Sequence, residues 1–208
     1  MADQPDVDEE KRATLRRFAT LGAATPLVGL GGRKAESTDD TSEVRTAIRG
    51  YLATTPGAHF SKVRDDLKLG TGETQHHLGR LLDAGAVETR KDGDYRRYFA
   101  AGQFSDFEQV ALGYLRRETA RGLLIALLAE PDATGSEIAR SLDVSRATVS
   151  TTAKELDAAG LLSRADGYEV RNPETVLTLL VRFADSFGSD AVAFAADAAD
   201  LIRFDPRQ

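Results

Sequence analysis

The chain repeats itself at a fixed offset of 75 residues, and this repeat limits the folds it can adopt. The matching register begins at Glu43 and Glu118 and continues without a gap to Gly85 and Gly160. Other identical pairs are Leu52 with Leu127, Pro56 with Pro131, Ala58 with Ala133, Ser61 with Ser136, Leu67 with Leu142, Leu81 with Leu156 and Ala84 with Ala159. A repeat of this kind indicates two copies of one small domain.

Each copy predicts three helices followed by a β-hairpin. Apolar residues at helical spacing place the three helices of the first copy over residues 44–52, 60–67 and 74–82. Ser42 and Thr71 are expected to cap the first and the third helix. The turn of the hairpin is predicted at Asp92-Gly93, between two strand-like runs.

The second copy predicts the same order, with Ser145 capping the third helix and a shorter hairpin turning at Asp166-Gly167. After Pro173, two more helices are expected, separated at Gly188. The expected class is mainly α with small β-hairpins, an α+β fold. The expected segments are a disordered and apolar N-terminal segment with a linker (1–42), the first copy (43–102), a connecting helix (103–116), the second copy (117–171) and C-terminal helices (172–208).

The N-terminal segment lies outside the repeat. Residues 1–12 are acidic and polar, which predicts disorder. The pair Arg16-Arg17 before the apolar run 19–32 resembles a twin-arginine export signal, but Phe18 follows the pair directly and no small-residue cleavage site follows. The run is also short for a bilayer span, which needs about 20 apolar residues. We therefore expect at most weak membrane association through residues 14–32.

Charge separates the two copies. The whole chain has a net charge of −6, which is unusual for a protein that binds DNA. Residues 43–102 nevertheless hold ten Lys and Arg against eight Asp and Glu, whereas residues 106–171 hold eight against eleven. The first copy is therefore the better electrostatic candidate for contact with phosphate.

The composition favours Asp and Arg and contains neither Cys nor Trp. This bias resembles that of haloarchaeal proteins, in which concentrated salt screens the attraction to phosphate. An acidic mesophile protein from a GC-rich genome is the alternative source of the same bias. Without cysteine, the chain forms no disulfides and has no thiolate chemistry.

Three helices followed by a hairpin resemble a winged helix-turn-helix, which places its third helix in the major groove of DNA and its hairpin, the wing, on the flanking backbone. In the third helix of the first copy, each residue is rotated by about 100° from the one before it. With Leu78 pointing inward, the exposed face of this helix is polar. We expect its DNA-binding residues to be Thr71, Glu73, Gln75, His76 and Arg80. In the second copy we expect Ser145, Arg146, Ser150, Thr151 and Lys154. Arg80 suits the edge of a guanine.

The first wing carries four basic residues interleaved with Tyr95 and Tyr98. A cluster of this kind fits contact with phosphate or with the minor groove. A charged edge strand that resists aggregation is the alternative reading. The second wing offers only Arg164 and Arg171 against two acids, so we expect it to be mostly structural. The wing residues predicted to bind DNA are Arg90, Lys91, Arg96, Arg97 and Arg164.

Other chemistries lack a supporting pattern. His76 and His77 are adjacent, and on a regular helix they point about 100° apart, so they cannot jointly hold one metal ion. No nucleophile elbow or phosphate-binding glycine loop is present. We therefore expect a protein that is not an enzyme, with no catalytic residues, no metal and no cofactor.

Two stretches in each copy carry a family resemblance. They run from Pro56 to Phe60 and Thr71 to Leu78, and from Leu115 to Thr119 and Ser145 to Ser150. Over residues 43–187 the chain resembles archaeal predicted transcriptional regulators with two winged helix-turn-helix domains, related to the MarR and ArsR types. The resemblance implies sequence-specific binding of double-stranded DNA and control of transcription. The metal-sensing cysteines of the ArsR type are missing here, so metal sensing is not implied.

Three hypotheses follow. The first is a cytoplasmic DNA-binding transcriptional regulator. Its homodimers would match palindromic sites, and its first copy would make the main contact with DNA. The second is an architectural or protein-interaction module, which the acidic second copy favours. The third is a membrane-tethered regulator anchored through residues 14–32.

Overall fold

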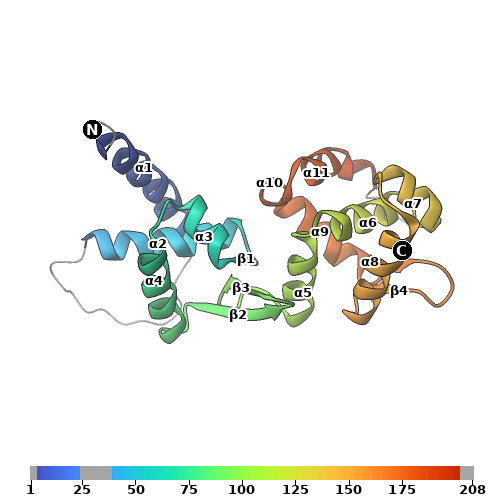
Figure 1. Cartoon of the computed structure of the whole chain (residues 1–208), viewed down its shortest axis with the longest axis horizontal. Coiled ribbons are helices and arrows are strands. Elements are labelled where there is room, and N and C mark those ends of the chain that lie inside the picture. The colour runs from blue at the N-terminus through green and yellow to red at the C-terminus, as the bar shows by residue number, and fades with distance from the viewer. Residues whose placement is uncertain (1–3, 24–38, 202–208) are drawn as a thin grey trace, which may run out of the picture. The chain divides into compact units, whose positions relative to one another are not determined.

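The structure is a computed structural model that describes residues 4–23 and 39–201. The chain divides into two compact units, with the boundary between Phe104 and Ser105. Most of the predicted linker and of the apolar run, residues 24–38, lies outside the described residues. Figure 1 labels most of the elements of the two units.

Unit 1 holds the first copy of the repeat together with an additional helix before it. Three antiparallel strands form a small sheet in the order β1-β3-β2, with Ala58 opposite Tyr98 and Val87 opposite Ala100. The predicted hairpin is confirmed, and Gly93 in its turn has a φ of 59°, which glycine adopts without strain. The elements are α1 (Gln4–Ala23), α2 (Asp39–Thr54), β1 (Ala58–His59), α3 (Phe60–Asp66), α4 (Thr71–Asp83), β2 (Val87–Asp92) and β3 (Tyr95–Ala100).

Two predicted helix caps in unit 1 were wrong. Because α2 already begins at Asp39, Ser42 lies inside the helix rather than at its cap. Gly70 is the N-cap of α4, and Thr71 is its first helical residue. The carboxylate of Glu73 accepts a hydrogen bond from the backbone N–H of Gly70 at 3.1 Å. That bond stabilises the helix start without a hydroxyl at the cap.

Helix α1 corrects the prediction of disorder for residues 4–12, which form its first turns, whereas residues 1–3 lie outside the described residues. Leu15 is only 2% exposed and belongs to the core of unit 1. Phe18 packs edge-on against Tyr51 of α2, with 5.3 Å between ring centroids. The apolar residues of α1 that the prediction assigned to a membrane-touching segment thus include two that pack against unit 1.

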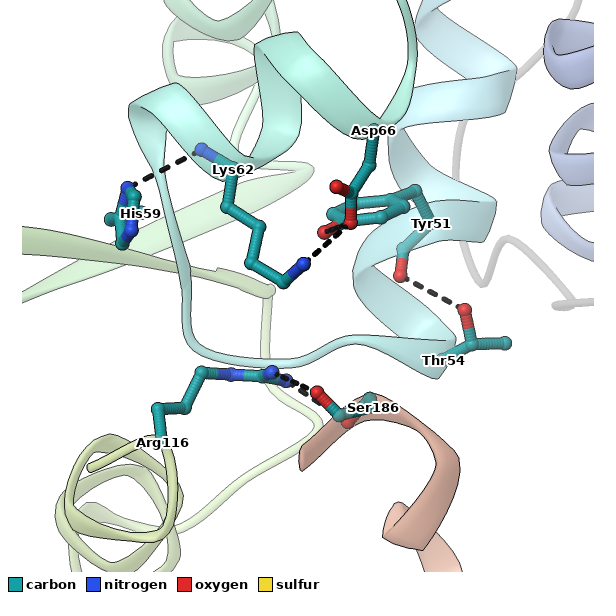
Figure 2. Close-up of polar contacts among 7 residues, drawn as sticks. All are labelled: Tyr51, Thr54, His59, Lys62, Asp66, Arg116 and Ser186. Carbon is teal, nitrogen blue, oxygen red and sulfur yellow. Dashed lines mark hydrogen bonds and ion pairs between the residues drawn. The ribbon is translucent and has the colours of Figure 1, made fainter. Parts of the chain in front are cut away.

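A hydrogen bond joins α3 to α2 (Figure 2). The hydroxyl of Tyr51 donates to the carboxylate of Asp66 at 2.7 Å, and Lys62 Nζ donates to the same oxygen at 2.9 Å. At the other end of α3, His59 Nδ1 accepts from the backbone N–H of Lys62 at 3.3 Å. These bonds fix the helix that precedes α4.

Unit 2 holds the second copy, and its predicted order of elements is confirmed. Ser145 caps α8 as predicted, accepting from the backbone N–H of Thr148 at 3.0 Å. The elements are α5 (Asp106–Leu115), α6 (Glu118–Ala129), α7 (Gly135–Ser141), α8 (Arg146–Ala158), β4 (Leu162–Ser163), β5 (Glu169–Val170), α9 (Pro173–Arg182), α10 (Ala184–Phe187) and α11 (Ser189–Leu201).

The repeat is visible in the backbone as well as in the sequence. Lys68 and Asp143, which are 75 positions apart, both have a φ of 53° in the turn before the third helix. Gly85 and Gly160, at the same offset, have φ values of 65° and 74° just after that helix. A left-handed conformation at matched positions shows that the two helix-turn-helix segments are built alike.

The expected connecting helix is part of unit 2, because α5 packs on α6 and α9. Arg116 joins this region to α10: its Nη1 donates to the carbonyl of Ser186 at 2.7 Å and its Nη2 to the hydroxyl at 3.1 Å (Figure 2). Arg121 of α6 is buried and donates from Nε to Asp190 of α11 at 2.8 Å and from Nη1 to the carbonyl of Leu115 at 3.0 Å. The C-terminal helices thus cover the second copy.

The Arg121–Asp190 pair predicts a pH dependence of stability. Partial burial alone would raise the pKa of the Asp190 carboxyl, but the hydrogen bond and the charge of Arg121 lower the pKa below its ordinary value. The pair therefore stabilises the fold above the unfolded pKa of about 3.9 and ceases to do so as the pH falls through the folded value. We expect the melting temperature of wild type to exceed that of Asp190→Asn near neutral pH, and this difference to disappear in acid. A difference in melting temperature that stays the same across that pH range would contradict the assignment.

Among residues 4–23 and 39–201, none of the helices combines the length and the hydrophobicity that crossing a bilayer requires.

Candidate nucleic-acid interface

Helix α4 has one buried face and one polar face. Its inner side carries Thr74, His77, Leu78 and Leu81, which are all buried. The predicted inward direction of Leu78 is therefore confirmed, and the burial of His77 separates the two adjacent histidines. The residues predicted for DNA contact that lie exposed on α4 are Thr71, Gln75, His76 and Arg80.

Glu73 was predicted on the exposed face of α4 but is half-buried and engaged within unit 1. Lys11 of α1 donates to its two carboxylate oxygens at 3.0 and 2.9 Å. Burial alone would raise the pKa of this carboxyl, but the bonds from Lys11 and Gly70 hold the pKa below its usual value. The Glu73 carboxylate is thus paired with Lys11 and bonded to the N-cap of α4.

The turn before α4 holds a second contact from α1. Lys68 forms an ion pair with Glu10, and both side chains are exposed. With the Lys11–Glu73 pair, this contact attaches the N-terminal half of α1 to the start of α4. Exposed ion pairs of this type contribute little to stability, so the apolar contacts of α1 must supply most of its attachment.

Helix α8 of unit 2 repeats the two-faced pattern of α4. Val149, Ala153 and Leu156 are buried on its inner side. All the residues predicted for DNA contact on this helix and its cap are exposed or half-buried at the surface, namely Ser145, Arg146, Ser150, Thr151 and Lys154. Small hydroxyl side chains and two cations suit close approach to a groove.

The first wing holds like charges opposite each other. In the β2–β3 ladder Lys91 lies opposite Arg96, and both are exposed. The next pair is Arg90, half-buried, opposite Arg97. Directly opposed like charges destabilise an antiparallel pair of strands. An anion between Lys91 and Arg96 would relieve their repulsion.

Arg97 corrects the predicted set of phosphate contacts, because its side chain is buried. The residue is 4% exposed. Its Nε donates to Asp92 at 2.8 Å and its Nη1 donates to the carbonyl of Gly57 at 3.2 Å. The guanidinium therefore joins the hairpin turn to the segment before β1, and it is not available to phosphate.

Two aromatic residues meet at this wing, Tyr95 of the predicted basic and aromatic cluster and His59, which was not predicted as part of a site. The ring of Tyr95 stacks on that of His59, with 5.1 Å between centroids and 30° between planes. The guanidinium of Arg97 lies 5.4 Å from the centroid of Tyr95. His59 could not be predicted at the wing because the two-residue strand β1 has no periodicity in the sequence. Only the pairing of β1 with β3 brings His59 to the wing.

The second wing is small. Its two strands pair only Leu162 with Val170 and Ser163 with Glu169. Arg164, predicted to contact DNA, is exposed just beyond β4. The ladder of this wing contains no pair of opposed cations. In the described part of the chain, no three side chains of the metal-binding types are grouped to hold a metal ion.

Comparison with known proteins identifies both copies. Residues 42–112 match a family described as an N-terminal HTH domain, and residues 115–171 match the MarR family. An uncharacterized HTH-type transcriptional regulator of the archaeon Methanocaldococcus jannaschii is 27% identical over 130 residues, which are 62% of this chain and 32% of the relative. The chain thus aligns with about a third of that protein's length. No solved structure matches the chain.

The matches agree with the structure on the number and type of domains. The first match extends from α2 through most of α5, and the second from the end of α5 to the second wing. Helix α1 and the helices after Arg171 lie outside both matches. The chain therefore carries two HTH-type domains in tandem, the first similar to an N-terminal HTH domain and the second similar to the MarR family.

Proposed function

We propose that this protein is a sequence-specific, DNA-binding regulator of transcription. The observation that carries the proposal is the opposed pair Lys91 and Arg96 on the exposed face of the wing that follows α4. Maintaining two facing cations costs stability in the free protein. Two phosphates of a DNA backbone would attract the two cations and offset their mutual repulsion. The two helix-turn-helix domains and the name of the archaeal relative support the same function.

In the proposed function, unit 1 makes the main contact with DNA. Helix α4 enters the major groove with its N-terminal residues toward the base edges, as the recognition helix of this motif does. Arg80 reads a guanine edge, and Gln75 and His76 bond to bases or phosphates. Thr71 at the helix start reaches a phosphate through its hydroxyl, and the wing residues Arg90, Lys91 and Arg96 follow the adjacent backbone.

In the proposed function, unit 2 makes a secondary contact with DNA. Its exposed residues on α8 can enter a second groove, but its sequence is acidic and its wing is short. A homodimer would place equivalent helices on the two halves of a palindromic site. The haloarchaeal character of the chain and its relation to the ArsR type remain predictions from composition and motif.

The wing cations provide the test. We expect Lys91→Ala/Arg96→Ala to weaken binding of full-length protein to DNA fragments that wild type selects from a genomic pool. The slope of log Kd against log salt should fall by about 2, one for each phosphate that the variant no longer neutralises. Fluorescence anisotropy at several salt concentrations measures both quantities. Arg164→Ala, in the second wing, is the matched control and should change the slope less.

The result also separates the proposal from its alternative. The net negative charge of residues 106–171 favours a protein-interaction role for unit 2. If wild type shows no sequence-selective binding at any salt, the regulator proposal fails. If Lys91→Ala/Arg96→Ala abolishes DNA binding but leaves regulation in cells and the fold intact, the protein-interaction role is favoured.

A further inference from the structure

Tyr95 is an exposed aromatic residue at the tip of the first wing. It is the first residue of β3, two positions after the turn glycine, and it is 53% exposed. The core of unit 1 does not require it there, because Tyr98 and Phe99 supply the buried aromatic rings of this strand. An aromatic ring kept in water at the end of a hairpin is available for an external contact.

The ring of Tyr95 is held in place by its neighbours. It stacks on His59, which is itself fixed by its bond with the backbone of Lys62. Arg97 lies against the same ring and is anchored by Asp92 and by the carbonyl of Gly57. Fixing a side chain before binding reduces the entropic cost of binding. This arrangement presents a preorganised aromatic surface.

The charges of the hairpin tip identify the partner of this ring. Lys91 and Arg96 are exposed on the opposite face of the same hairpin, because successive side chains of a strand point to opposite faces, and the half-buried Arg90 shares the face of Tyr95. Proteins that enter the minor groove combine basic residues with apolar side chains that pack against sugars or between base steps. A hairpin tip with a fixed aromatic ring on one face and two exposed cations on the other matches that combination.

We propose that Tyr95 is a DNA contact of the first wing, and that it packs against the sugar and base edges of the groove flanking the α4 site. Arg97 is its positioning residue and touches no DNA. This inference rests on the proposed function, since it assigns a residue to the same interface. It adds a contact that works through apolar surface, whereas Lys91 and Arg96 work through charge.

The salt dependence of binding distinguishes these two kinds of contact. Using the full chain and a labelled fragment selected by wild type, we expect Tyr95→Ala to weaken binding at least fivefold, roughly 1 kcal/mol, with an unchanged salt slope. Tyr95→Phe keeps the ring and should bind within about twofold of wild type, which is under about 0.5 kcal/mol. Lys91→Ala, the charge comparison on the same hairpin, should lower the slope by about 1.

A double-mutant cycle tests the role of Arg97. Arg97→Lys keeps the positive charge but removes the planar group that lies against Tyr95. Its effect on DNA affinity should largely disappear in the Tyr95→Ala background, whereas its effect on melting temperature should persist. Additive effects on affinity would overturn the positioning role.

The outcomes separate this inference from the function on which it rests. If wild type binds DNA and Tyr95→Ala binds equally well, Tyr95 is not a contact and the regulator proposal stands. If Tyr95→Ala lowers the salt slope, the ring acts through the neighbouring charges and the inference is overturned. If wild type selects no DNA, both the proposed function and this inference fail. Circular dichroism confirms that each variant is folded.

Discussion

Arg97→Ala should lower the free energy of unfolding of unit 1 by about 3 kcal/mol, because breaking a buried ion pair by removing one partner is strongly destabilising. Arg97 and Asp92 have side-chain exposures of 5% and 12%, and their atoms lie 2.8 Å apart. The substitution also removes the donor to the carbonyl of Gly57. Urea denaturation of the full chain followed by circular dichroism measures the change, and Arg96→Ala, on the exposed neighbour, should shift it by under about 0.5 kcal/mol.

A double substitution checks the physical reason. Replacing both partners, as in Arg97→Met/Asp92→Leu, removes the charges together and should cost much less than Arg97→Ala alone. If the double variant is as unstable as the single one, the destabilisation comes from packing rather than from the broken ion pair. If Arg97→Ala unfolds at the same urea concentration as wild type, the pair does not hold the wing.

The helices that carry the candidate interface could be predicted because their signals are local. On α4 and α8, apolar residues recur at helical spacing, and Leu78 and Val149 are buried where that spacing places them. The Asp-Gly turns predicted both hairpins because glycine reaches the positive φ that these turns need. The repeat supported these predictions independently, because each helix or hairpin was predicted separately in both copies and an error would have had to occur in both.

Arg97 could not be predicted from its residue type, because exposed arginines dominate the basic wings of DNA-binding proteins. The alternation of β3 did contain a signal. Side chains two apart in a strand share a face, and Arg97 is two positions from Phe99, which is fully buried. What the sequence did not reveal was the partner of the guanidinium, because Gly57 is 40 positions away and comes close only when β1 pairs with β3.

The first part of helix α1 was predicted as disorder because residues 1–12 are acidic and polar, and composition is a weak guide when a few apolar residues can pack on a neighbour. Residues 4–12 contain one large apolar residue, Val7, so this half of the helix has no apolar stripe to predict it. Leu15 and Phe18, three positions apart, supply the contact with α2. Tertiary packing against an existing core stabilises such a helix, and no local pattern reports it.

Leu15→Ala should therefore destabilise the packing of α1 on unit 1 by about 2–3 kcal/mol, toward the lower end of the range for truncating a buried leucine, because a peripheral helix can relax around the cavity. The side chain is 2% exposed and contributes to the same core as Tyr51. Hydrogen exchange provides the measurement, since the amides of α1 should become less protected while those of α4 keep most of their protection.

The control for this variant is Arg16→Ala at the next residue of α1. The Arg16 side chain is 77% exposed, and its Nε lies 3.9 Å from Glu43, so its removal should change stability little. Equal deprotection in Arg16→Ala and Leu15→Ala would mean that charge holds α1, contrary to the apolar packing of Leu15. Because α1 lies outside both matched domains, Leu15→Ala also leaves intact every residue proposed to touch DNA. Retained DNA binding in that variant would show that α1 supports the fold of unit 1 without forming part of the interface.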